Sequence, residues 1–183
     1  MKLFAVVAAT VLAAGSGGAR AATRDVLGRE VPIGHGRPAL VFYTNRDNQA
    51  ALHDSAFGFT YRLRRAMPLV VVHVDLSDVP SLLRGLAIRE IRRAERESLA
   101  EMARVFHAHG KTPPPQLARS LYMVADAHGA SRRALGLQEH FRQPYAQALD
   151  ADGRELARGP FPQDAREIAQ AIRAHAPVAE AER

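Results

Sequence analysis

The chain has 183 residues, 25 basic and 19 acidic side chains, and no cysteine. This length suits a single domain, and the absence of cysteine excludes disulfide bonds, so stability has to come from the core. The arginines are interspersed with glutamates and form no single basic stripe, so no nucleic-acid partner is expected.

The first residues have the pattern of a secretory signal. Lys2 gives a positive start, residues 3–14 form an apolar run, and Ala19 and Ala21 are small residues at a cleavage site. We therefore predict a cleaved signal peptide over 1–22 and a periplasmic or secreted protein with no stable membrane insertion after cleavage. An uncleaved membrane anchor is the alternative. One domain over 23–176 and a flexible tail over 177–183 complete the predicted organisation, and the partner we expect is another cell-envelope protein.

Hydrophobic patterning predicts alternating strands and helices in the first half. A short hairpin is expected over 26–33, and the apolar runs 39–43 and 69–74 are typical of strands that are covered on both faces. Between these strands, apolar residues at helical spacing predict a helix that ends near Ala66 and is stopped by Pro68. This order implies a right-handed parallel crossover.

The second half continues the pattern and ends in a hairpin and a helix. A long helix is expected over 81–107, and three prolines at 113–115 predict an extended connector. A strand over 121–125 and a small helix over 130–135 follow. Strands over 145–149 and 154–158 should pair across a turn that Gly153 closes, before a last helix over 164–175.

These segments, in this order, resemble the thioredoxin-like superfamily, especially its exported redoxin branches. The resemblance runs from about Asp25 to Ala174 and is carried by "DVLGREVPI", "RPALVFY", "PLVVVHVDL", "MVADAHGASRRALGL" and "QPYAQALDADGRELARG". A YtfJ-like branch with altered active-site residues is similar in "NRDNQAAL". The resemblance implies an α/β fold with a central mixed sheet flanked by helices, an N-terminal β-hairpin and a long inserted helix. It also identifies Pro144 with the cis-proline that faces the active-site loop of the family.

The chain departs from this family where the family carries two cysteines. Asp47 and Ala50 are nearest to those positions, and neither a carboxylate nor a methyl group can form a disulfide or a sulfenic acid. Thiol–disulfide oxidoreductase, peroxidase and thiol-dependent copper-chaperone activities are therefore excluded. We expect no cofactor, no metal site and no catalytic residue.

The degenerate active-site loop remains the candidate binding site. It lies at the carboxyl end of a parallel strand and at a helix N-terminus, a common position for ligands. One hypothesis is an open polar pocket, and the other is a structural helix cap formed by Asp47 or Asn48. The candidate residues are Thr44, Asn45, Arg46, Asp47, Gln143 and Pro144.

The main functional prediction is a non-redox binding or accessory module, and two alternatives stay open. A hydrolase or metal-dependent enzyme would require at least three of His53, Asp54, Asp47 and His73 to converge, although His73 alone suggests an interior imidazole. A structural or oligomer interface would use the arginine-bearing long helix. Pairs such as Arg93 with Glu97 favour a self-neutralised, solvated face instead.

Overall fold

A computed structural model describes residues 23–176, and the predicted signal peptide and tail lie outside these residues. The described chain forms a five-stranded mixed sheet with the order β3-β2-β1-β4-β5. Its strands and helices, in chain order, are β1 (Ala39–Thr44), α1 (Gln49–Arg62), β2 (Leu69–Asp75), α2 (Ser81–Ala108), a 3₁₀ turn (Pro115–Arg119), β3 (Leu121–Asp126), α3 (Ala130–Ala134), β4 (Tyr145–Leu149), β5 (Glu155–Pro160) and α4 (Ala165–His175).

β1, β2 and β3 run parallel to one another, and β4 and β5 are antiparallel to their neighbours. β1 pairs with β2 from Ala39 with Leu69 onward, and β2 pairs with β3 in the same direction. β4 pairs antiparallel with β1, with Tyr43 opposite Tyr145, and β5 forms the edge of the sheet beside β4. The β1–α1–β2 crossover is therefore confirmed.

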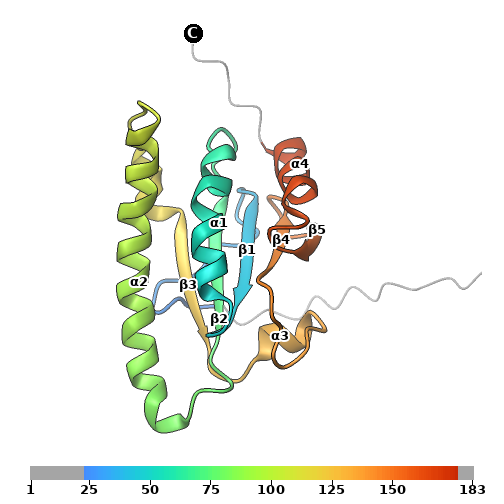
Figure 1. The fold of residues 1–183 in the computed structure, drawn as a ribbon. Coiled ribbons are helices and arrows are strands. Elements are labelled where there is room, and N and C mark those ends of the chain that lie inside the picture. Colours follow the sequence, from blue (N-terminus) through green and yellow to red (C-terminus); the bar gives the residue numbers. More distant parts are fainter. Residues whose placement is uncertain (1–22, 177–183) are drawn as a thin grey trace, which may run out of the picture.

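The helices are distributed unequally over the two faces of the sheet. Figure 1 shows α1 and α2 side by side on the near face, with α4 beside them over β4 and β5. Phe42, Phe59 and Ile168 belong to the buried cluster on this face. The opposite face carries a second buried cluster that includes Val41 and Val71, and it is covered by residues of the amino-terminal segment and of the stretch around Leu135 and Phe141. Alternate side chains of β1 and β2 thus enter separate clusters, as the period of a strand requires.

Several boundaries differ from the sequence prediction for local reasons. The expected hairpin over 26–33 is reduced to a turn with one antiparallel bridge, between Arg24 and Glu30, and no strand forms in this segment. α1 ends at Arg62 rather than near Ala66, because the Leu63 N–H bonds tightly to Thr60 O. Pro115 begins a 3₁₀ turn instead of an extended connector, since a first helical residue needs no N–H partner.

An ionic cluster holds the amino-terminal segment against the edge of the sheet. The Arg29 guanidinium bonds the carboxylates of both Asp25 and Glu95, and it also donates to Leu121 O. Burial raises the pKa of Glu95, although the charge of Arg29 opposes that shift. Because Glu95 lies on α2, the cluster fixes this helix against β3.

Candidate functional site

The first-helix loop, residues 44–49, is folded by two asparagine side chains. Asn45 Oδ1 accepts the N–H groups of Asp47 and Asn48 at 3.0 and 3.1 Å, so Asn45 caps the turn that leads into α1. Asn48 occupies the residue before α1, yet its side chain makes no capping bond to the helix. It instead accepts from Thr44 Oγ1 at 2.6 Å and from the Asn45 N–H at 3.0 Å. The expected cap by Asp47 or Asn48 is therefore supplied by Asn45.

The same two asparagines tie this loop to the segment that precedes β4. Asn45 Nδ2 and Asn48 Nδ2 both donate to the Phe141 carbonyl, at 3.0 and 2.8 Å. We call this pair of bonds the amide clasp. Asn45 and Asn48 are 5% and 2% exposed. The clasp fills the position at which the sequence suggested an open polar pocket, and it satisfies buried amides that would otherwise be costly.

The six candidate residues divide into a buried and an exposed set. Thr44, Asn45 and Pro144 are buried, whereas Arg46, Asp47 and Gln143 are exposed. The pairing of Tyr43 with Tyr145 brings Pro144 beside Thr44, so the structure does bring the two halves of the candidate site together.

Pro144 is not a cis-proline. Phe161–Pro162 is the only cis peptide bond within residues 23–176, so the bond between Gln143 and Pro144 is trans. The trans form is the favoured isomer by about 0.5–1 kcal/mol. Pro144 instead extends the pairing of the last two strands, because its carbonyl accepts the Phe161 N–H at 2.8 Å.

His73 has the interior role that the sequence suggested. Its ring stacks on Tyr43, and its Nδ1 lies 2.9 Å from Ser131 Oγ. Burial lowers the pKa of His73 to about 4, against an opposing effect of the Asp126 charge. The imidazole is therefore uncharged at neutral pH, and its base strength is too low for efficient proton abstraction there.

The residues that the enzyme hypothesis requires do not converge. His53 Nδ1 lies 3.5 Å from Asp54 Oδ1, but within the described part of the chain no hydrogen bond or ion pair joins this pair to Asp47 or His73. His53 lies on α1, on the opposite side of the sheet from the Tyr43–His73 stack. Residues 23–176 also contain no group of three or more His, Asp or Glu side chains suited to hold a metal ion.

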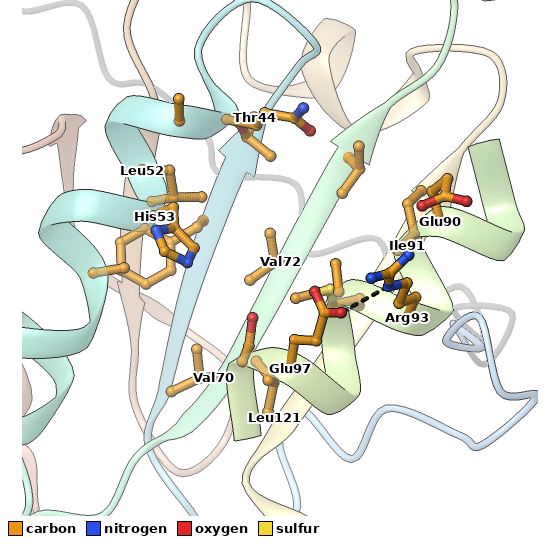
Figure 2. A pocket seen from close by; sticks show the side chains of 18 of the residues that line it. Thr44, Leu52, His53, Val70, Val72, Glu90, Ile91, Arg93, Glu97 and Leu121 are labelled. Carbon is orange, nitrogen blue, oxygen red and sulfur yellow. Dashed lines mark hydrogen bonds and ion pairs between the residues drawn. The ribbon is translucent and has the colours of Figure 1, made fainter. Parts of the chain in front are cut away.

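A second feature, an apolar groove between α1 and α2, begins next to the first-helix loop. It has a volume of about 750 Å³, and Figure 2 looks into it, with His53 on one wall and Arg93 and Glu97 on the other. Alternate residues of β2, Val70, Val72 and Val74, form its floor. Val72 is only half-buried although β2 lies inside the sheet, so the groove leaves part of the floor uncovered.

Aromatic packing joins the two helices beyond one end of this groove. Tyr61 of α1 packs edge-on against Phe106 of α2, with ring centroids 5.1 Å apart, and stacks on His109 at 4.2 Å. Because α1 and α2 follow parallel strands, they run in the same direction, and α2 extends beyond the start of α1 in Figure 1. Arg46, just before α1, and Gln49, its first residue, line the other end of the groove.

Sequence reasoning missed both the clasp and the groove. The spacing of Asn45 and Asn48 was a usable signal, because two amides three residues apart at a helix start can cap and cross-link a turn. The groove has no comparable signature. In the sequence, the residues that line the groove have the pattern of ordinary core positions. The groove becomes visible only from the distance between the two helices.

Comparison with known proteins identifies the fold. No protein-family model and no curated protein matches the sequence. Among solved structures, the chain is similar to a candidate thiol:disulfide interchange protein DsbE from Chlorobium tepidum, with 14% identity, 85% of this chain and 92% of that chain covered, and a TM-score of 0.51. It is also similar to BsSco, a member of the Sco family of cytochrome c oxidase assembly proteins, with 10% identity, 86% and 92% coverage and a TM-score of 0.50.

The chain therefore has a thioredoxin-like fold and carries no cysteine. The predicted pair of Arg93 with Glu97 is confirmed, with Arg93 Nε 2.7 Å from Glu97 Oε1. None of the helices between residues 23 and 176 combines the length and hydrophobicity that crossing a bilayer demands.

Proposed function

We propose that this chain is an exported, non-redox binding or accessory protein that takes an apolar ligand in the groove between α1 and α2. The observation that carries the proposal is the groove itself, whose 750 Å³ and largely aliphatic lining match the size and character of small-molecule sites. Of the six candidate site residues, Thr44 and Arg46 line it. The clasp gives the rest of the loop a supporting role, because it holds the start of α1 in place beside the groove.

A matched pair of alanines tests the location of the ligand. Ala50 and Ala51 are adjacent exposed residues of α1, but only Ala50 lines the groove. With the neutral probe N-phenyl-1-naphthylamine, the unmodified protein should give saturable fluorescence enhancement. Ala50→Trp should weaken this binding at least tenfold, and Ala51→Trp should leave it within twofold. No saturable binding, or equal loss in both variants, would refute the proposed site.

The non-redox part of the proposal has its own test. Without a thiolate the purified protein should neither reduce insulin nor consume peroxide above a heat-treated control. A rate that scales with the concentration of the native protein would contradict this part.

Export is supported by the signal-like start of the sequence. Amino-terminal sequencing of the protein from the envelope fraction of its own cells should begin at Ala22 or Thr23, after removal of the signal. A chain that retains Met1 in that fraction would favour the uncleaved anchor instead.

An accessory role with a protein partner is favoured by one surface. Leu82, Leu83 and Leu86 at the start of α2 are 95%, 52% and 49% exposed. Clustered apolar side chains of this kind often mark interaction surfaces. Capture from the cell envelope should lose a partner with Leu82→Gln and keep it with Leu27→Gln, which alters another exposed leucine. A partner that both variants retain would exclude this surface.

A further inference from the structure

We infer that the ligand of the groove is a single-chain anionic amphiphile, with its hydrocarbon chain along β2 and its head group at Arg46. The inference rests on the proposed binding function and adds the chemical class of the ligand. Three features of the groove support it: its elongated shape, the charges along its walls, and the guanidinium of Arg46, which has no partner within residues 23–176.

The shape of the groove suits an extended chain. From Val70 to Leu76 the floor is about 20 Å long at the usual rise of a strand. The volume of about 750 Å³ is spread along this aliphatic floor, so the groove is elongated. A flexible hydrocarbon chain fits such a groove.

Most charged side chains along the walls already have a neighbour of opposite sign or a polar partner. Arg93 donates a hydrogen bond to Glu97. This bond and the negative charges of Glu97 and Glu90 raise the pKa of Arg93. Asp54 lies beside His53. Among the described residues, neither Asp54 nor Glu90 has a guanidinium partner of its own, so the charge left in the middle of the groove is negative and disfavours an anionic head group there.

Arg46 differs from these residues. It lines the groove at the start of α1, is exposed, and makes no hydrogen bond or ion pair with any other residue in 23–176. The adjacent Asp47 does not line the groove and forms no ion pair with Arg46. No acidic residue lies in the first turn of either α1 or α2. Within the part of the chain that the structure describes, the Arg46 guanidinium is thus a cation without a partner at this end of the groove, and it complements a carboxylate, sulfate or phosphate head group.

Two amphiphiles of equal chain length test the inference. Calorimetric titration below the micellar range should show dodecanoate binding at least tenfold more tightly than dodecyltrimethylammonium. Arg46→Glu should weaken dodecanoate binding at least tenfold while the neutral naphthylamine probe still binds within twofold. Arg65→Glu makes the same charge change just beyond the other end of α1 and should alter neither. Ala50→Trp should weaken both amphiphiles.

The outcomes separate the inference from the proposed function. If the neutral probe binds but the two amphiphiles bind equally, or the cationic one binds more tightly, the inference is overturned and the groove remains a binding site. If none of the three binds, the proposed function fails as well. Sedimentation velocity could instead show a dimer that the Ala50→Trp substitution dissociates. That result would place a second copy of the chain in the groove and would also overturn the inference.

Discussion

The start of α1 separates two regions of opposite character. On one side lies the clasp, in which Asn45 and Asn48 are buried and the oxygen and nitrogen of both side-chain amides are hydrogen-bonded. On the other side lies the groove, with an aliphatic floor that is left partly uncovered at Val72. The first region has polar side chains and no open space, whereas the second has open space above an apolar floor.

This difference shows how a thioredoxin-like fold can exist without its thiols. A helix start that lacks cysteine still carries unpaired N–H groups, and here asparagine side chains satisfy them. The loop then becomes part of the scaffold. The binding function that we propose lies at the neighbouring surface, where apolar area is left exposed to solvent. Substitutions in each region can test the two against each other.

The largest effect is expected from breaking the clasp. Asn48→Ala removes an acceptor from Thr44 and the Asn45 N–H and a donor from Phe141 O, and it should lower the free energy of unfolding by about 3 kcal/mol. Urea denaturation followed by far-ultraviolet circular dichroism measures this change. Asp47→Ala, at an exposed neighbour, should stay within about 0.5 kcal/mol. A loss below about 1 kcal/mol for Asn48→Ala would mean that the clasp contributes little.

The next largest effect depends on pH and on His73. Because the pKa of His73 is about 4 when folded and near 6.5 when unfolded, the unfolded chain binds the extra proton between these values. The free energy of unfolding should therefore fall as the pH drops from 6.5 to 4, by roughly 2 kcal/mol for a partly exposed ring.

Variants isolate this contribution from the other titrating groups. His73→Gln should remove the His73 part of the slope, and His53→Gln, on the exposed wall of the groove, should not. The His53 variant controls for the other titrating groups, so the difference between the two variant curves reports on His73 together with the Asp126 charge that acts on it. Parallel curves for the unmodified protein and His73→Gln would contradict the assignment.

A smaller effect should come from filling the groove. A ligand present at ten times its dissociation constant stabilises the folded state by about 1.4 kcal/mol. Dodecanoate at that ratio should therefore shift the urea midpoint of the unmodified protein. The same concentration should leave Ala50→Trp nearly unaffected, because the indole would occupy the groove. Equal stabilisation of both proteins would show that the amphiphile binds elsewhere.

The smallest effect is expected for the groove variant itself without ligand. Ala50 is exposed, so Ala50→Trp should change the free energy of unfolding by no more than about 0.5 kcal/mol, like Ala51→Trp. Urea denaturation of the two variants gives the comparison. A loss above about 1 kcal/mol for Ala50→Trp alone would mean that the groove is closed in solution.

The sequence was sufficient for the fold where local pattern and tertiary role agree. The apolar runs that form β1 and β2, and the turn at Gly153 with its φ of +81°, lie where the pattern predicts them. The sequence was insufficient where contacts with distant residues determine the local structure. The segment around Val26 has the pattern of a hairpin, yet the Val26 N–H donates to Met123 O at the sheet edge. Pro144 matches a family position, but its bond is trans.

The candidate site shows the same limit. The loop and its six residues could be located from the sequence, because they follow a strong strand and precede a helix. Which side of that helix is open depends on contacts between remote residues, such as Asn48 with Phe141 and Tyr61 with Phe106. No local pattern encodes the space that those contacts leave.

Amide chemical shifts test the account most directly, because one titration compares the two regions. With ¹⁵N-labelled mature protein and dodecanoate, backbone signals of Ala50, Val72 and Ala94 in the groove should move in a saturable way. The side-chain amide signals of Asn45 and Asn48 should stay in place, since the clasp remains closed. Shifts confined to those two amides and to Gln143, with the groove signals unchanged, would contradict the account.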